Sequence, residues 1–165
     1  MSQITKLLQA NEGYAAARAN VADPRPGRHL AIVTCMDSRL DLFGALGLDL
    51  GEAHIIRNAG GIATDDVVRS LVLSQRMLGT DRIMLIHHTY CGIQGLDEDE
   101  LRRSISAETG VTTTISFGSF TDAAEDVRRT ADRLDREPAL RHVEIRGFVF
   151  DVDTGALTEV AVERR

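Results

Sequence analysis

The chain has 165 residues, a mass of 18.0 kDa and a hydrophobic fraction of 43%, which suit one compact domain and exclude a largely disordered protein. Its net charge of −6, its lack of tryptophan and its aromatic fraction of 4% exclude the basic, aromatic surface that nucleic-acid binding needs. Its two cysteines, Cys35 and Cys91, cannot form a disulfide-rich scaffold.

The N-terminal part is predicted to form a helix and an arm. The predicted helix at residues 3–19 is followed by a breaker run, Asp-Pro-Arg-Pro-Gly, at 23–27. We therefore divide the chain into an N-terminal helix and arm at 1–26 and an α/β domain at 27–165. The helix carries apolar side chains at helical spacing, namely Ile4, Leu7, Leu8 and Tyr14.

Targeting signals are not expected in this sequence. Residues 1–10 lack the continuous apolar stretch of a signal peptide. No segment approaches the roughly 20 apolar residues that a membrane span requires. We expect a cytoplasmic protein with neither a membrane nor a nucleic acid as its partner.

Extended and helical segments alternate after the arm and predict one α/β domain. Short apolar runs without clean alternation indicate parallel strands that are covered on both faces, at 29–34, 53–57 and 82–88. Helices are predicted at 40–47, 64–79, 97–109 and 121–137. A strand at 143–151, a turn at 153–155 and an edge strand at 156–160 predict a hairpin. The expected fold is a mostly parallel central sheet with flanking helices and an antiparallel edge strand.

The charged residues of the last predicted helix are interpreted as a solvated face. Glu125 and Arg129 are spaced i,i+4, and so are Asp132 and Arg136. Pairs at this spacing stabilise a helix at its surface.

Potential metal ligands follow two of the predicted strands. Cys35 directly follows the first strand, and His88 and Cys91 come at the end of the third. Because the carboxyl ends of parallel strands meet at one edge of the sheet, these three side chains can converge. Each alone would more often be a buried structural residue, but two thiolates and an imidazole together form a ligand set that suits Zn²⁺.

Asp37 and Arg39 decide what such a zinc site could do. If Asp37 filled the fourth tetrahedral position, the site would be closed and its role structural or sensory. If Asp37 paired with Arg39 instead, the fourth position would be free for water. The open arrangement predicts a hydrolase or hydratase, with zinc-bound hydroxide as the nucleophile and Asp37 orienting it.

The glycine-rich turn after the second strand lacks the spacing of a dinucleotide-binding or phosphate loop. We expect it to allow a close backbone approach, which would either bring a main-chain N–H near the metal pocket or form a plain tight turn. Ala59, Gly60 and Gly61 are accordingly assigned to the substrate pocket. His87 should point to the opposite face of its strand from His88 and serve a structural role.

The sequence resembles the β-class carbonic anhydrases, in particular their short bacterial branch, from Gly27 to Val160. The residues that carry this resemblance are Cys35-x-Asp37-x-Arg39, the run Arg57-Asn58-Ala59-Gly60-Gly61, His88-x-x-Cys91-Gly92 and the strand at 146–151. Tyr90 departs from the pattern, since many relatives have Asp at this position.

The resemblance implies a carbonate dehydratase, a zinc lyase that reversibly hydrates carbon dioxide to bicarbonate. It implies zinc held by Cys35, His88 and Cys91, and a homodimer or higher homo-oligomer with the pocket near the subunit contact. It also implies a switch, in which Asp37 binds zinc in an inactive state and pairs with Arg39 in the active one.

Three alternatives stay open at this point. An enzyme of the same scaffold could hydrolyse carbonyl sulfide or carbon disulfide, which are small linear molecules like carbon dioxide. A closed Cys₂HisAsp site would be structural or sensory. A thiol redox protein without metal is the third alternative.

Overall fold

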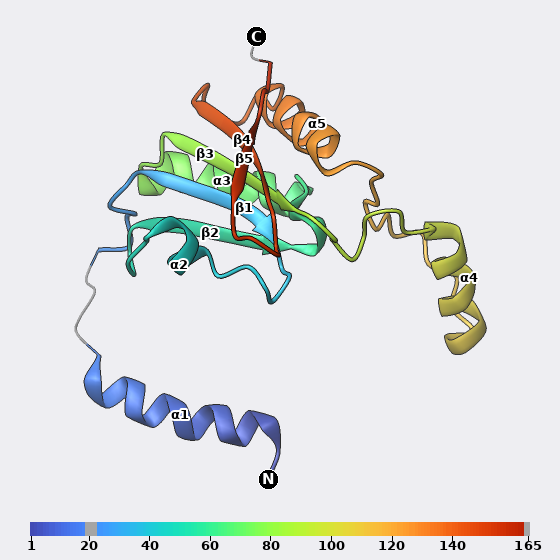
Figure 1. The fold of residues 1–165 in the computed structure, drawn as a ribbon, viewed down its shortest axis with the longest axis horizontal. Coiled ribbons are helices and arrows are strands. Elements are labelled where there is room, and N and C mark those ends of the chain that lie inside the picture. Colours follow the sequence, from blue (N-terminus) through green and yellow to red (C-terminus); the bar gives the residue numbers. More distant parts are fainter. Residues whose placement is uncertain (19–22, 164–165) are drawn as a thin grey trace.

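The computed structural model describes residues 1–18 and 23–163, which form a five-stranded sheet with helices on both faces (Figure 1). The strand order is β2-β1-β3-β4-β5, in which the first four strands are parallel and β5 is antiparallel to β4. This architecture confirms the predicted fold class. The strands are β1 (Leu30–Cys35), β2 (Ala53–Asn58), β3 (Arg82–His88), β4 (Glu144–Phe150) and β5 (Leu157–Val160).

Side-chain caps fix most helix boundaries. Thr64 accepts a hydrogen bond from the backbone of Val67, and Gly79 ends that helix in a left-handed conformation, as predicted. The segment predicted as a helix at 40–47 is shorter, because Asp41 caps it and Gly47 ends it. The helices are α1 (Gln3–Ala17), α2 (Leu42–Leu46), α3 (Asp65–Leu78), α4 (Glu98–Thr109) and α5 (Ala123–Asp135), with a 3₁₀ turn, η1, at Ala59–Gly61.

The core lies in two layers, one on each face of the sheet. Helices α3 and α5 bury Leu71 and Leu134 in one cluster with Val33 and Leu85 of the sheet. The second layer lies on the face covered by α2, and its buried members are Ile32, Cys35, Leu40, Leu42, Leu48, Ile86, Cys91, Phe120 and Phe150. Strands β1 and β3 are therefore covered by apolar layers on both faces. This explains why apolar and polar residues do not alternate in their sequences. Both cysteines belong to the second layer.

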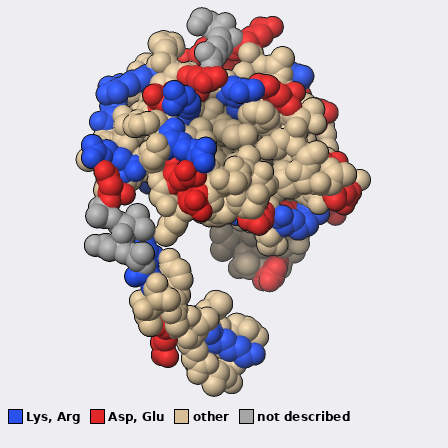
Figure 2. Space-filling model, turned by 60° about the vertical axis from the view of Figure 1, so that its left-hand side comes forward, with Lys and Arg blue, Asp and Glu red and all other residues tan. Residues whose placement is uncertain are grey.

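Helix α1 has no buried residue and lies apart from the rest of the chain (Figure 1). It ends at Ala17, before the predicted end at residue 19, which lies outside the described residues. In Figure 2 it projects as an arm that carries few charged side chains, whereas acidic and basic side chains are intermixed on the body. Its exposed apolar side chains are Met1, Ile4, Leu7, Leu8 and Tyr14. Among the described helices, none is long and apolar enough to cross a membrane.

The charge pairs of α5 differ in part from the prediction. Asp132 and Arg136 do pair, at 2.7 Å. Glu125 pairs with Arg128 and not with Arg129, which pairs with Asp126. The interpretation of a solvated face is confirmed, because Glu125, Arg129, Asp132 and Arg136 are all exposed. Amphipathic spacing alone did not reveal that a carboxylate of this helix faces the sheet.

The carboxylate of α5 that faces the sheet belongs to Asp126, and it pairs with His87. Asp126 is only 2% exposed, and its Oδ2 lies 2.7 Å from His87 Nε2. His87 is fully buried, and its ring also packs against Phe120. It points to the α5 side of β3, whereas His88 points to the opposite side, as the alternation of a strand requires. The prediction of a buried structural His87 is thereby confirmed.

Helix α4 projects from the body and is fastened to the loop that follows it (Figure 1). The Glu98 carboxylate accepts hydrogen bonds from the backbone N–H groups of Ser119 at 2.9 Å and Phe117 at 3.2 Å, and it pairs with Arg102. These backbone bonds, together with the Arg102 guanidinium, lower the pKa of Glu98 to about 2.

We predict that the attachment of α4 weakens in acid. The folded-state pKa of Glu98 lies below its ordinary value of 4.5, so its contribution is complete above about pH 4.5 and is lost as the pH falls toward 2. Hydrogen exchange at the amides of Phe117 and Ser119, corrected for the intrinsic rate, should lose protection over this range. Glu98→Gln should lack this pH dependence, and the matched variant Glu100→Gln on the same helix should keep it. Protection that is unchanged in acid would contradict the prediction.

Candidate metal centre

Three potential metal ligands converge at the carboxyl edge of the sheet. Cys35 ends β1, His88 ends β3, and Cys91 follows three residues after His88. One ligand atom of each lies within 4.8 Å of the others, and the two Sγ atoms are 3.9 Å apart. All three side chains are buried. The structure thus brings together the residues that the sequence suggested as ligands.

The orientation of His88 leaves one ring nitrogen free for a metal. Its Nδ1 lies 2.9 Å from the carbonyl oxygen of Thr89, which favours a proton on Nδ1. Its Nε2 is buried and makes no hydrogen bond with the described residues. A buried nitrogen without a partner is costly, and a metal ion would supply that partner.

The separation of the thiols also fits zinc. Tetrahedral coordination with Zn–S bonds of about 2.3 Å places two sulfur atoms about 3.8 Å apart. The observed 3.9 Å between the Sγ atoms of Cys35 and Cys91 agrees with this value without rearrangement. The donor set of two thiols and one imidazole is one that zinc binds.

The surroundings of the two thiols differ. Burial raises the pKa of Cys35, but the neighbouring His88 and the backbone N–H groups of Asp37 and Gly60 outweigh burial and lower that pKa to about 7. For Cys91, burial and the proximity of Cys35 raise the pKa. Because metal binding requires thiolates, Cys35 is the thiol closer to its metal-binding form at neutral pH.

The 3₁₀ turn η1 places its backbone directly against Cys35. The N–H of Gly60 donates a hydrogen bond to Cys35 Sγ at 3.3 Å. Gly61 has φ +72°, and a Cβ built there would lie 2.8 Å from the carbonyl carbon of Thr34. The two glycines therefore allow the close backbone approach that we expected, and it reaches a ligand sulfur.

Arg57 organises the loop after β1, a role that the sequence reasoning missed. From β2 its guanidinium donates hydrogen bonds to the carbonyl oxygens of Cys35 at 2.9 Å, Asp37 at 2.6 Å and Leu40 at 3.3 Å. These bonds hold the backbone that carries one ligand and its neighbours. Nothing in the residues near Arg57 in the sequence indicates these distant carbonyl partners.

Asp37 pairs with Arg39 in this structure and does not join the ligand cluster. Arg39 donates from Nε to Asp37 Oδ1 at 2.9 Å and from Nη2 to Asp37 Oδ2 at 2.8 Å. These hydrogen bonds hold the pKa of the Asp37 carboxyl far below its usual range, so the group is ionised. Its Oδ2 lies 3.8 Å from His88 Nε2, which places the carboxylate beside the ligand atoms. This is the open one of the two arrangements that the sequence allowed.

The Arg39 guanidinium also reaches the second ligand loop. Its Nη2 donates to the carbonyl oxygen of Tyr90 at 3.0 Å, and Tyr90 lies between His88 and Cys91. Arg39 therefore connects the loop after β1 with the loop after β3.

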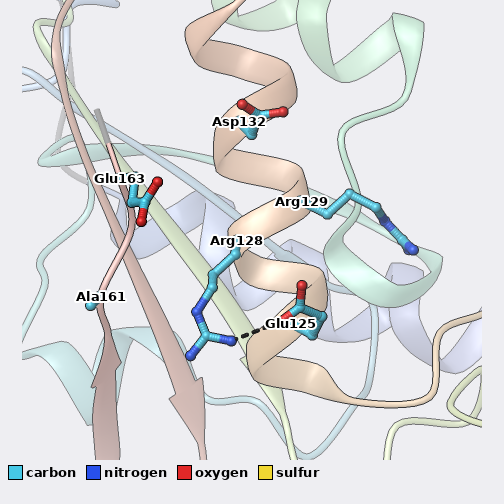
Figure 3. Close-up of a pocket in the computed structure, with 6 residues that line it drawn as sticks. All are labelled: Glu125, Arg128, Arg129, Asp132, Ala161 and Glu163. Carbon is cyan, nitrogen blue, oxygen red and sulfur yellow. Dashed lines mark hydrogen bonds and ion pairs between the residues drawn. The ribbon is translucent and has the colours of Figure 1, made fainter. Parts of the chain in front are cut away.

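A surface cavity of about 440 Å³ lies away from these residues, between α5 and the C-terminal segment (Figure 3). Arg128 pairs there with Glu125, and Arg129 points away from them around the helix (Figure 3). Its lining contains no cysteine or histidine, and consists of Glu125, Arg128, Arg129, Asp132, Ala161 and Glu163. The cavity thus lacks the donor atoms that make the Cys35–His88–Cys91 cluster chemically distinctive.

Comparisons with known proteins agree on one family. The family model described as carbonic anhydrase matches residues 30–157. Beta-carbonic anhydrase 1 of Mycobacterium tuberculosis is 49% identical over 161 residues, which cover 97% of this chain and 99% of that protein. A carbon disulfide hydrolase of Acidithiobacillus thiooxidans is 34% identical over 180 residues, covering 95% of this chain and 90% of that protein. The crystal structure of carbonic anhydrase from Streptococcus mutans superposes with a TM-score of 0.92 at 42% identity, covering 98% and 99% of the two chains.

We predict that Gly61→Ala disrupts the metal centre. The new Cβ would press on the backbone of Thr34 and Cys35, so we expect a loss of about 2 kcal/mol or more in the free energy of unfolding and a weaker affinity for zinc. Gly110→Ala is the matched control, because Gly110 has the same φ of +72° but open space around it. The control should lose only about 1–2 kcal/mol, the cost of the left-handed backbone, and keep its zinc affinity. Denaturant unfolding and zinc titration measure both effects, and equal zinc affinity in the two variants would contradict the prediction.

Proposed function

This chain belongs to the carbonic anhydrase family, in its β class, and on that premise we propose that Cys35, His88 and Cys91 hold the zinc ion with which it hydrates carbon dioxide to bicarbonate. The observation that carries the assignment is the ligand cluster itself, in which Nε2 of the buried His88 has no hydrogen-bond partner among the described residues and lies beside two thiols 3.9 Å apart. Bound zinc supplies Lewis acidity, which makes a water molecule acidic enough to act as a nucleophile near neutral pH.

We assign the orientation of the attacking water to Asp37. Its carboxylate is ionised and can only accept hydrogen bonds, so a water or hydroxide beside the ligands would donate its proton toward Asp37 and turn a lone pair toward the substrate carbon. Arg39 keeps Asp37 ionised and in place through its paired hydrogen bonds. Addition of hydroxide to carbon dioxide gives bicarbonate directly, and the proton taken from water leaves to solvent.

The surroundings of the cluster suit a small apolar substrate. Cys35 and Cys91 belong to the apolar layer that contains Ile86 and Phe150, and Ile93 packs against it. Such a setting excludes bulk water and strengthens the interaction of the substrate with nearby charges. The assignment of Ala59, Gly60 and Gly61 to the substrate pocket stays a prediction, supported by the hydrogen bond from Gly60 to Cys35.

Hydrolysis of carbon disulfide is the second candidate function. The similarity to a carbon disulfide hydrolase, at 34% identity over 95% of this chain, favours it. The greater similarity to beta-carbonic anhydrase 1 supports carbon dioxide as the principal substrate. A closed structural site is less well supported, since Asp37 is engaged by Arg39.

We further propose that the chain is cytoplasmic and works as a homodimer or higher oligomer. The apolar face of α1 supports assembly, because Ile4, Leu7 and Leu8 are 63–71% exposed. A helix with such a face is stabilised when another surface covers it. We accordingly keep the division of the chain at residue 26, in which residues 1–26 take part in assembly and residues 27–165 carry the metal centre.

The proposed activity predicts rapid hydration of carbon dioxide by the zinc-loaded protein. A stopped-flow assay at about pH 8 to 9 should give a rate far above the background reaction, and Asp37→Asn should lower kcat by about 10²-fold or more, as expected for loss of an orienting acceptor. Metal analysis should give about one zinc per chain in both proteins. A fully loaded wild-type protein at the background rate would refute the proposal. Release of hydrogen sulfide from carbon disulfide at a higher kcat/KM would favour the second candidate.

The proposed assembly predicts that acidic substitutions in α1 separate the subunits. Leu7→Asp and Leu8→Asp should each weaken association at least about tenfold, since burial of a leucine contributes about 1.5–3 kcal/mol. Gln9→Glu adds the same charge outside the apolar face and should leave association unchanged. Sedimentation velocity over a range of concentrations measures the effect. A monomeric wild-type protein would be incompatible with this part of the proposal.

A further inference from the structure

Tyr90 has an unusual backbone conformation in the turn between His88 and Cys91. Its φ is +55°, and in the described part of the chain only one other non-glycine residue, His29, has a positive φ. The left-handed region is unfavourable for a bulky L-residue because its Cβ comes too close to the following carbonyl oxygen. Such a conformation persists only where surrounding contacts hold it.

The Tyr90 ring does not supply those contacts. Its side chain is 70% exposed, and its hydroxyl makes no hydrogen bond with residues 1–18 or 23–163. The main chain does supply one, because the Tyr90 carbonyl oxygen accepts a hydrogen bond from Arg39 Nη2 at 3.0 Å. The polar interaction of this residue is thus made by its backbone.

This bond links the Asp37–Arg39 pair to the other ligand loop. Arg39 and Asp37 are two residues apart in the loop after β1, so the bonds between them do not fix the pair relative to β3. Arg39 has no other hydrogen-bond partner outside its own loop within the described residues. The Tyr90 carbonyl therefore restricts the position of Arg39. Through Arg39 it also restricts the distance between Asp37 Oδ2 and His88 Nε2, which is 3.8 Å.

We propose that Tyr90 is a positioning residue for the Asp37–Arg39 pair, acting through the carbonyl oxygen that its left-handed backbone presents to Arg39. This inference rests on the proposed function, in which Asp37 orients the attacking water. The side chain at position 90 then affects the site only by making a positive φ at that residue more or less favourable. Glycine and asparagine tolerate a positive φ, whereas a β-branched residue disfavours it strongly.

Backbone preference gives a graded series of variants. Tyr90→Val should lower kcat about tenfold with KM changed less than about twofold, because the lost interaction acts on the orientation of the nucleophile. Tyr90→Asn and Tyr90→Gly should restore most of that loss. A loss that follows side-chain size, with glycine worse than valine, would overturn the proposal. If Tyr90→Val does not fold, Tyr90→Ala replaces it in the series. The kcat of Tyr90→Ala should lie between those of the valine and asparagine variants.

A double-mutant cycle with Arg39→Ala separates positioning from a general effect on the turn. If Tyr90 acts through Arg39, adding Tyr90→Val to Arg39→Ala causes no further loss of kcat. If the loss of kcat in the double variant equals the product of the losses in the two single variants, the proposal is refuted. Zinc content measured on every variant shows whether Cys91 still binds, and a loss of zinc in the asparagine variant would assign Tyr90 to metal binding and also refute it.

The visible absorption of the cobalt-substituted protein provides a readout independent of turnover. Tyr90→Val and Arg39→Ala should change the d–d bands in the same way, because both release the Asp37 carboxylate beside the metal, and Tyr90→Asn should keep the wild-type spectrum. An unchanged spectrum in Tyr90→Val would contradict the proposal. A wild-type protein without hydration activity would refute the proposed function instead, and the spectra would still test the positioning of Asp37.

Discussion

The parallel pairing of β1 with β3 is the constraint on which the rest of the site depends. The pairing ends at Thr34 and Ile86, and the buried Thr34 hydroxyl donates a hydrogen bond across it to the Ile86 carbonyl oxygen at 2.8 Å. Both ligand loops leave the sheet just beyond this point. A slip of one residue would exchange the faces of His87 and His88, so the register decides which histidine meets the cysteines.

The two neighbouring histidines show how one strand can serve two purposes. His87 is enclosed on the α5 side with Asp126 as its partner, whereas His88 Nε2 lies among the thiols and accepts no hydrogen bond from the part of the chain that the structure describes. The pair with Asp126 makes an exchange of faces costly, because it would leave a buried carboxylate without its histidine. A polar contact on one face of the sheet thereby protects the geometry on the other.

Local patterns in the sequence predicted much of the fold and the ligand cluster. Thr64 and Gly79 mark the ends of α3, and they were predictable because helix caps depend on residues close in the sequence. The convergence of Cys35, His88 and Cys91 was predictable because the carboxyl ends of parallel strands lie at one edge of a sheet. The remaining features depend on partners distant in the sequence. Arg57 binds carbonyl oxygens about twenty positions earlier in the chain, and Asp126 lies on a charged helix yet faces the core. Their sequence neighbours therefore gave no signal of either role.

The spacing of the two cysteines makes the proposed metal a cross-link of the chain as well as a reagent. Cys35 and Cys91 are 56 positions apart, and a clip that closes a loop of this length removes about 4 kcal/mol of conformational entropy from the unfolded state. Free zinc then enters the folding equilibrium by mass action, and each tenfold fall in its concentration above the dissociation constant removes about 1.4 kcal/mol of stability. The supply of metal would thus govern how long the folded enzyme persists as well as how fast it turns over.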